Sequence, residues 1–220
     1  AIKIGSPDFN NIQLIINAFK LKKPLFLSTG MASDNEINLM KKILKKFNIH
    51  KVPITIFHCV SSYPPSEDEI NLKYIKNLIK KFPKYDIGYS GHERGYFPSL
   101  ISIFYGSKVI ERHITTDNKL KGPDHIASLE PQELTKMISL IRDTEKMLGL
   151  NDKIITKSEQ KTKLLVRKSL VANNDIKKGE IFSKKNITTK RPGNGISPFK
   201  INKFLGKKSS KNFKKNQFIK

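Results

Sequence analysis

The chain of 220 residues contains no tryptophan, a single cysteine and no apolar run of 18 residues. Because Cys59 has no second cysteine to pair with, an internal disulfide is excluded, which is typical of a protein from a reducing compartment. The lack of a long apolar run excludes a membrane-spanning helix of ordinary length. We therefore expect a cytoplasmic protein with no membrane partner.

Acidic residues are scarce, since 19 Asp and Glu stand against 42 Lys and Arg and give a net charge of +23. The excess is uneven: residues 1–150 carry 22 basic and 15 acidic side chains, whereas residues 151–220 carry 20 and 4. A basic segment of this kind can bind a polyanion. However, lysines spread among Asn and Ile lack the interleaved Arg and aromatic residues on which nucleic-acid bases stack. We expect no nucleic-acid partner and keep polyanion binding by this segment as an alternative.

Short segments rich in Ile, Val and Phe alternate with longer segments of helical period along the first 149 residues. Strands are expected over residues 2–5, 25–29, 54–60, 86–90 and 108–115. Helices are expected over about 33–47, 67–82, 97–105 and 128–147. Ser33 with Glu36 forms a capping box for the first of these helices, Ser128 is the expected cap of the last, and Gly149 should end it. Strands spaced in this way, with one helix between each pair, can all be parallel with right-handed crossovers.

Polar residues at the strand ends separate the two folds that share this alternation. They are Lys3 and Ser6, Ser28, Ser61 and Tyr63, Ser90 and His92, and His113. A doubly wound sheet gathers ligand groups at one switch point, whereas a (β/α)₈ barrel draws them from nearly every strand onto one rim. The pattern favours the barrel. Because a closed barrel of this type needs eight strands and five are found, we expect the first three βα units to be missing.

The pattern changes after Gly149. Residues 150–165 are polar and rich in lysine, so we expect a linker between a partial barrel domain, 1–149, and a second domain, 166–220. The second domain consists of short β-like segments broken by turns, and at about 55 residues it is near the lower size at which domains fold alone. The fold class expected is therefore α/β, followed by a small β module.

His92 and His113 follow neighbouring expected strands and should lie at the same rim. Neutral imidazoles are common ligands of divalent first-row metals, so the pair predicts a shared metal site. Either histidine alone is also explained by an ordinary hydrogen bond at a strand end. Lys3 with the four strand-end serines predicts an anion cradle, because an ammonium, hydroxyls and backbone N–H groups are what a phosphate needs. Each serine is alternatively a helix cap.

Three further residues have two interpretations each. Asp124 follows a Gly-Pro turn and either bonds its own backbone or accepts a hydroxyl of a polyol substrate. Asp8 is either a general acid or base or a turn residue. Arg191, the one arginine in the last 50 residues, either is a surface charge or recognises a planar carboxyl or amide group.

Seven motifs now stand in one order: KIGS, LSTGMAS, HCVSSYPPSEDEINL, GYSGHERG, VIERHIT, GPDHIASLEP and RPGNGISP. In that order they resemble the sialic acid synthase family, which makes N-acetylneuraminate and related nonulosonates such as legionaminate. The resemblance covers nearly the whole chain. It implies a (β/α)₈ TIM barrel followed by an antifreeze-like (SAF) β-clip domain, in a domain-swapped homodimer whose small domain caps the other barrel. The implied reaction condenses phosphoenolpyruvate with the aldehyde of an N-acylmannosamine-type sugar and releases phosphate.

The resemblance also implies a role for each matching residue. His92 and His113 would hold Mn²⁺ or Mg²⁺. Phosphoenolpyruvate would be bound by Lys3, Ser6, Ser28 and Ser90, with Ser61 standing where many relatives have Asn. Tyr63 and Asp124 would contact the sugar, Arg191 would reach its N-acyl group across the dimer, and catalysis would rest on Asp8 and Lys3.

The chain departs from the family pattern in two respects. Asp8 replaces the Glu of many bacterial members, which shortens its reach by about one methylene but keeps its acid–base capacity. Family contacts expected on three further strands are not in this chain, so we expect the 220-residue polypeptide alone to be inactive or poorly folded. The alternative enzyme class is another metal-dependent TIM-barrel aldolase or an epimerase.

Overall fold

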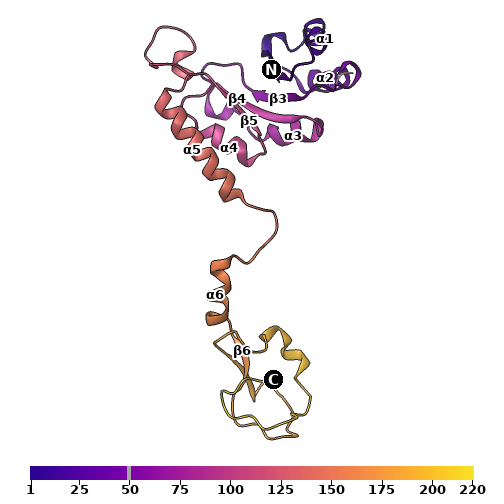
Figure 1. Ribbon diagram of the computed structural model, residues 1–220, viewed down its shortest axis with the longest axis vertical. Helices are drawn as coiled ribbons and strands as arrows, with labels where there is room; N and C mark the ends of the chain where they lie inside the picture. Colours follow the sequence, from indigo (N-terminus) through magenta and orange to yellow (C-terminus); the bar gives the residue numbers. More distant parts are fainter. Residues whose placement is uncertain (49–50) are drawn as a thin grey trace. The chain divides into compact units, whose positions relative to one another are not determined.

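The computed structural model describes residues 1–48 and 51–220 and divides the chain into two compact units, residues 1–149 and 150–220. Each unit is described by itself (Figure 1). Within the described residues, no helix combines the length and the apolar composition needed to cross a bilayer.

The first unit is built on a five-stranded parallel sheet in the order β1-β2-β3-β4-β5. Its strands are β1 (Ile2–Ile4), β2 (Leu25–Ser28), β3 (Ile54–Cys59), β4 (Asp86–Gly91) and β5 (Val109–Arg112). Every residue of β3 is buried, because a central parallel strand is covered on both faces. Sequential order with one helix per crossover is the arrangement of part of a (β/α)₈ barrel. All five strands lie where the periodicity predicted them.

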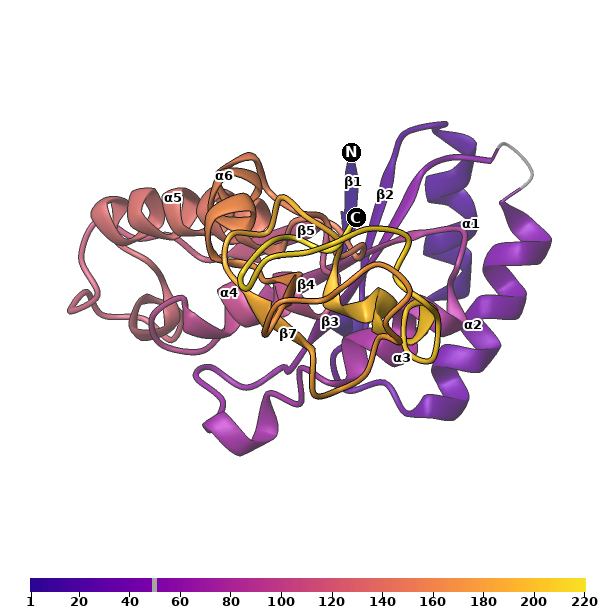
Figure 2. The ribbon, with the colours of Figure 1, turned by 90° about the horizontal axis from the view of Figure 1, so that it is seen from below.

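The described residues of this unit form the α-helices α1 (Ile12–Lys20), α2 (Asp34–Phe47), α3 (Tyr74–Lys81), α4 (Phe97–Phe104) and α5 (Pro131–Leu148). Single turns of 3₁₀ helix are η1 (Ser6–Asp8), η2 (Glu67–Glu69) and η3 (His125–Ala127). Figure 2 shows α1 and α2 beside one end of the sheet and α4 and α5 beside the other. The capping box predicted for α2 is present, with the Ser33 hydroxyl accepting from the Glu36 N–H and the Glu36 carboxylate accepting from the Ser33 N–H.

The main core lies between the strands and the helices that cover them. Leu27, Ile56, Leu44, Ile75 and Leu78 are all fully buried there. A smaller apolar cluster, Leu129, Met137 and Ile141, packs α5 against α4. The helices are thus fixed to the outside of the sheet, and the loops after the strands are held at one edge.

Two helix boundaries differ from the predictions. The helix expected over 67–82 is broken, because Asn71 adopts a positive φ of 45° and His58 Nε2 bonds the Ile70 carbonyl at 2.8 Å. Asn tolerates the left-handed region better than most residues. The cap of α5 is Glu130 rather than Ser128, whose hydroxyl donates instead to the Asp124 carbonyl at 2.7 Å.

The second unit holds α6 (Lys157–Val166), β6 (Ser169–Ala172), β7 (Ile187–Lys190) and the 3₁₀ helix η4 (Pro198–Lys203). β6 and β7 pair antiparallel, and isolated bridges add Val171–Phe218, Ile176–Phe213 and Ile181–Lys208. Its core is formed by Leu170, Ile176, Phe182, Ile187 and Phe213, among others. The segment expected as a linker, 150–165, contains most of α6, which begins at a capping box of Thr156 and Glu159.

Candidate active site

A cluster of four polar side chains lies across β1, β2, β4 and β5. Lys3 Nζ donates to Ser28 Oγ at 2.8 Å and lies 3.3 Å from Glu111 Oε1. The same Glu111 oxygen accepts from Ser90 Oγ at 2.8 Å. Ser28 and Ser90 are each 3% exposed, whereas the Lys3 and Glu111 side chains are about one-third exposed. The cluster therefore presents one ammonium and one carboxylate to the solvent edge over a buried hydroxyl floor.

A second group of hydroxyls meets around Gly30, in the loop after β2. The Gly30 N–H donates to Ser6 Oγ at 3.1 Å, and Ser6 Oγ lies 3.3 Å from Cys59 Sγ. A Cβ added at Gly30 would stand 2.3 Å from Ser61 Oγ and 2.6 Å from Ser6 Oγ. Two hydroxyls from different loops therefore converge where only a glycine leaves room. The hydroxyl groups of Ser6 and Ser61 can donate to an anionic oxygen.

His92 follows β4 and is 6% exposed. Its Nδ1 lies 2.7 Å from the Val60 carbonyl, and because a carbonyl only accepts, Nδ1 carries the proton and Nε2 keeps its lone pair. Burial lowers the pKa of His92, more than the Val60 hydrogen bond raises it. The ring stacks on Tyr63 at a centroid distance of 4.1 Å. His92 is thus a neutral imidazole with a fixed tautomer and a free nitrogen.

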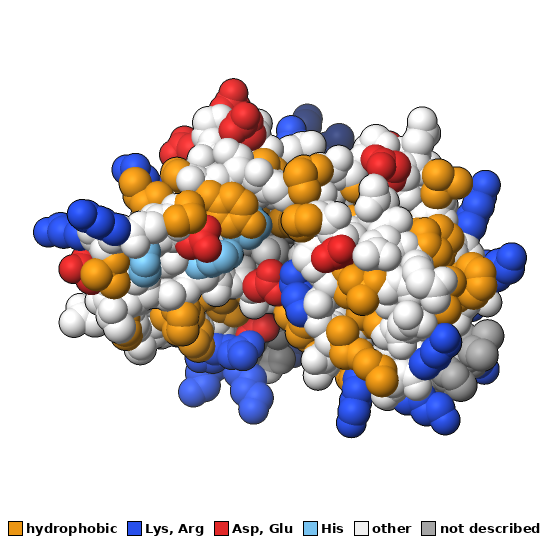
Figure 3. Space-filling view, turned by 90° about the horizontal axis from the view of Figure 1, so that it is seen from above, with side chains coloured by type: hydrophobic (Ala, Val, Ile, Leu, Met, Phe, Trp, Pro, Cys, Tyr) orange, Lys and Arg blue, Asp and Glu red, His pale blue; other side chains and the backbone are white. Residues whose placement is uncertain are grey.

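His113 follows β5, and its ring centroid lies 5.3 Å from that of His92. The Tyr63 ring is 5.7 Å away. His113 Nδ1 is 3.9 Å from an oxygen of Asp124, which lies in the loop before η3. Burial raises the pKa of the Tyr63 phenol, so its hydroxyl stays protonated and able to donate. Figure 3 shows histidine side chains gathered in one region of this face, beside acidic and apolar side chains.

The donor set of His92 and His113 fits a divalent metal ion. The two imidazole rings are neighbours, and the Val60 carbonyl fixes the tautomer of His92. A hydrogen bond of this kind orients a histidine that binds a metal. Among the residues that the structure describes, no group of three His, Cys, Asp or Glu side chains could hold a metal. An ion at these histidines would therefore have two protein ligands and keep positions for water or substrate oxygens.

Strand alternation explains why the two clusters face the same way. Residues two apart on a strand point to the same side of a sheet. Ser90 precedes His92 by two residues, and Glu111 precedes His113 by two. The anion cluster, which consists of Lys3, Ser28, Ser90 and Glu111, and the histidine pair thus occupy one rim.

Within the first unit, the predicted residue Asp8 lies apart from these groups. Asp8 ends η1 and is exposed, and its carboxylate accepts a long hydrogen bond of 3.3 Å from Asn11, as a turn residue does. Arg191 is an exposed residue of the second unit, directly after β7. Lys3, Ser28 and Ser90 share one network, which Asp8 does not join among the described contacts.

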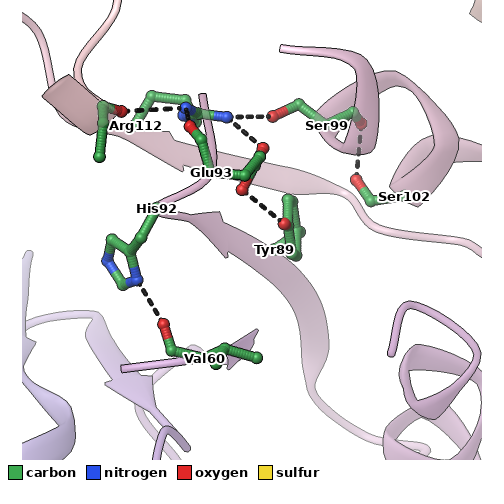
Figure 4. A network of polar contacts seen from close by, with 8 residues as sticks. Val60, Tyr89, His92, Glu93, Ser99, Ser102 and Arg112 are labelled. Carbon is green, nitrogen blue, oxygen red and sulfur yellow. Dashed lines mark hydrogen bonds and ion pairs between the residues drawn. The ribbon is translucent and has the colours of Figure 1, made fainter. Parts of the chain in front are cut away.

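Sequence reasoning missed several residues of the site. Glu111 was read as a strand residue, although its position two residues before His113 places it on the same face. The role of Gly30 could not be predicted, because the room that it leaves for two hydroxyls depends on segments that are distant in sequence. A buried network behind the histidines, which joins Glu93, Arg112, Tyr89 and Ser99, was also missed (Figure 4).

These side chains are together suited to an anionic ligand. Lys3 supplies positive charge, the hydroxyls supply donors, and Glu111 is a carboxylate that can accept a proton. The imidazole pair stands beside them.

Comparison with protein-family models gives two matches, the NeuB family over residues 1–153 and the SAF domain over residues 167–220. The N,N'-diacetyllegionaminic acid synthase of Campylobacter jejuni is 47% identical over 217 residues, which is 99% of this chain and 65% of the relative. The human N-acetylneuraminate-9-phosphate synthase is 36% identical over 207 residues, or 94% of this chain and 57% of the relative. The chain thus spans less than two thirds of the length of these relatives.

Solved structures show the same architecture. The N-acetylneuraminic acid synthetase of Leptospira borgpetersenii, crystallised with citrate, gives a TM-score of 0.67 at 38% identity and covers 73% of this chain and 55% of that one. A spore coat polysaccharide biosynthesis protein of Bacillus subtilis gives 0.61 at 28% identity, over 99% and 65%. The fold class predicted from the sequence, part of a TIM barrel followed by a SAF domain, is confirmed.

Proposed function

The chain belongs to the NeuB family, the sialic acid synthases, and from this membership we propose that it carries most of the active site of a nonulosonate synthase. The proposed reaction condenses phosphoenolpyruvate with the open-chain aldehyde of an N-acylmannosamine-type sugar. One observation carries the proposal: the anion cluster and the imidazole pair of His92 and His113 lie on the same rim. The cluster consists of Lys3, Ser28, Ser90 and Glu111. The family relatives supply the substrate class.

Phosphoenolpyruvate would lie against Lys3 and the hydroxyls of Ser6, Ser28, Ser61 and Ser90. The ammonium neutralises phosphate or carboxylate oxygens, and the hydroxyls of Ser6 and Ser61 beside Gly30 add donors. In this partly buried site, the ammonium and the hydroxyl donors are already oriented before the substrate binds. They therefore stabilise the bound anion and the negative charge that develops during the reaction.

His92 and His113 would hold the divalent ion, Mn²⁺ or Mg²⁺, which polarises a carbonyl oxygen when bound. Tyr63, stacked on His92, keeps the ring in place and offers a phenol donor to the sugar. Asp124 lies beside His113 and would accept a sugar hydroxyl. The aldehyde end of the acceptor would thus be oriented between the two rings and the anion cluster.

The bond changes follow from the chemistry of the substrates. C3 of phosphoenolpyruvate forms a bond to the aldehyde carbon, and the aldehyde oxygen takes up a proton. Attack through C3 leaves C2 electron-deficient, and water adds there and gives one proton to a base. The C–O bond to phosphate then breaks while the C2 hydroxyl becomes the keto group and passes its proton to the leaving phosphate. Glu111 and Asp8 are the candidate bases. Glu111 lies within the anion cluster, whereas Asp8 would have to turn away from Asn11.

We extend the proposal to a homodimer in which Arg191 of one chain reaches the acceptor's N-acyl group bound in the other. An exposed guanidinium in the SAF domain supports this, because its planar fork suits a carbonyl oxygen.

Phosphate release tests the proposal. The segment of the Campylobacter jejuni relative that precedes the matched region is joined to Ala1, and the chimera is assayed with phosphoenolpyruvate and Mn²⁺. The acceptors are N-acetylmannosamine, its 6-phosphate and a diacylated 6-deoxy analogue. Release that requires one of these acceptors, and that His92→Ala abolishes, is expected. A folded chimera that releases no phosphate with any acceptor contradicts the proposal and favours another aldolase or an epimerase.

A further inference from the structure

We propose that Glu93 and Arg112 act as a positioning pair, which fixes the distance between the His92 and His113 rings from behind the strands. The inference rests on the metal site of the proposed function, but it concerns groups on the opposite side of β4 and β5 from the imidazoles. It assigns these two residues a role in holding the site rather than in the chemistry.

Chain placement gives the first reason. Glu93 directly follows His92, and Arg112 directly precedes His113. Neighbouring residues of an extended segment point to opposite sides. Figure 4 shows His92 directed toward Val60, while Glu93 and Arg112 lie on the other side of the end of β4, toward Ser99 of α4. Each member of the pair is therefore one peptide unit away from one imidazole.

The contacts between the two residues are directional. Arg112 Nη1 forms an ion pair with Glu93 Oε1, and Arg112 Nη2 donates to the Glu93 main-chain carbonyl at 2.6 Å. The guanidinium thus contacts both the side chain and the main-chain carbonyl of Glu93, the residue after His92. The Tyr89 hydroxyl donates to the second Glu93 oxygen at 2.8 Å, which fixes the carboxylate. A planar fork with several donors can hold such a geometry, and a single ammonium cannot.

The same arginine also reaches the loop that carries Asp124. Its Nη2 donates to the Ala127 carbonyl at 3.2 Å, in η3, whose N-terminal cap is Asp124. One side chain thus ties the end of β4, the end of β5 and this loop together. Those three segments carry His92, His113 and the neighbouring carboxylate.

Burial distinguishes this pair from the other ion pairs of the barrel unit. The Arg112 and Glu93 side chains are 2% and 5% exposed, whereas those of Lys108 and Asp86, which join the opposite ends of the same strands, are 71% and 52% exposed. Desolvation makes a buried ion pair a poor source of net stability, and apolar replacement of both partners is often tolerated. The pair therefore serves through the bonds of Arg112 to main-chain carbonyls, which fix the strand ends.

The experiment compares metal binding, ring geometry and stability in the 220-residue chain. The test variant is Glu93→Gln with Arg112→Met, which removes both charges but leaves an acceptor for Tyr89. The control, Asp86→Asn with Lys108→Met, removes the exposed pair from the same two strands. Readouts are Co²⁺ affinity by absorption spectroscopy, nuclear Overhauser contacts among the Tyr63, His92 and His113 ring protons without metal, and the thermal midpoint.

We expect the test variant to bind Co²⁺ about 10- to 100-fold more weakly and to lose the His92–His113 ring contact. Its thermal midpoint should lie below that of the control, because the Glu93 and Ala127 carbonyls lose their guanidinium donor. The control should keep both properties. Arg112→Lys, which keeps the charge but not the fork, should also weaken Co²⁺ binding. Should the double variant fail to fold, this lysine variant decides by the same readouts.

Unchanged Co²⁺ affinity and unchanged ring contacts in a folded test variant would overturn the inference. If the unmodified chain binds Co²⁺ no better than the His92→Ala variant does, the metal site of the proposed function is wrong. In that case the ring contacts of the metal-free chain still decide whether Glu93 and Arg112 position the imidazoles.

Discussion

Replacement of Gly30 by alanine tests whether the hydroxyls of Ser6 and Ser61 form an anion site. The added Cβ would lie 2.3 Å from Ser61 Oγ, 2.6 Å from Ser6 Oγ and 3.1 Å from Cys59 Sγ. Carbon and oxygen atoms in ordinary contact are about 3.3 Å apart even in weak hydrogen bonds. Both hydroxyls must therefore move by several tenths of an ångström or more. The Gly30 backbone is not left-handed, so alanine adds no backbone strain and the effect is local to these side chains.

The expected magnitudes follow from this crowding. Overpacking of a close-packed site costs about 1–3 kcal/mol. Displacing Ser6 also weakens the hydrogen bond from the Gly30 N–H, which is worth about 1 kcal/mol. We expect Gly30→Ala to lower the free energy of unfolding by about 2 kcal/mol. The affinity for phosphoenolpyruvate should fall about 5-fold, since a loss of about 1 kcal/mol corresponds to that ratio of dissociation constants.

Urea unfolding and isothermal titration calorimetry with phosphoenolpyruvate measure both effects. Gly5→Ala is the matched control, because its Cβ would meet only Pro7 Cδ, at an ordinary 3.6 Å. Adding Ser6→Ala and Ser61→Ala to Gly30→Ala should recover stability but not binding. Equal phosphoenolpyruvate affinity in Gly30→Ala and Gly5→Ala would refute the assignment of these hydroxyls to the anion site.

Three further predictions concern other parts of the barrel unit. Lys3→Met should weaken phosphoenolpyruvate binding about 10- to 100-fold, because a hydrogen bond to a charged group contributes about 1.5–3 kcal/mol; calorimetry checks this against Lys20→Met, and equal losses would contradict it. Burial lowers the pKa of His58 below 6.5 despite its bond to Ile70, so the unfolded chain binds the proton first and stability should fall as pH drops below 6.5. Urea unfolding between pH 7 and 5 should show a shallower fall in His58→Gln, and an identical fall would exclude this histidine as its source. The 220-residue chain alone should release no phosphate in the condensation assay, and measurable acceptor-dependent release would show that the further strands are dispensable.

The elements of this protein that depend on near neighbours in sequence could be predicted. The capping box of Ser33 and Glu36 joins groups three residues apart, and Gly149 ends α5 with a positive φ of 55°. The strands were evident because buried parallel strands need continuous apolar runs. The break between η2 and α3 could not be predicted, because it depends on His58, which bonds Ile70 from 12 residues away.

The sequence by itself determined the family, the order of the strands and the rim on which His92 and His113 stand, because ordered motifs and strand alternation are properties of the linear chain. Only the tertiary structure decided the partners of those residues. Glu111 meets Lys3 and Ser90, and Arg112 meets Glu93, through the register of separate strands. Contacts of that kind depend on how distant segments pack, and no local pattern encodes them.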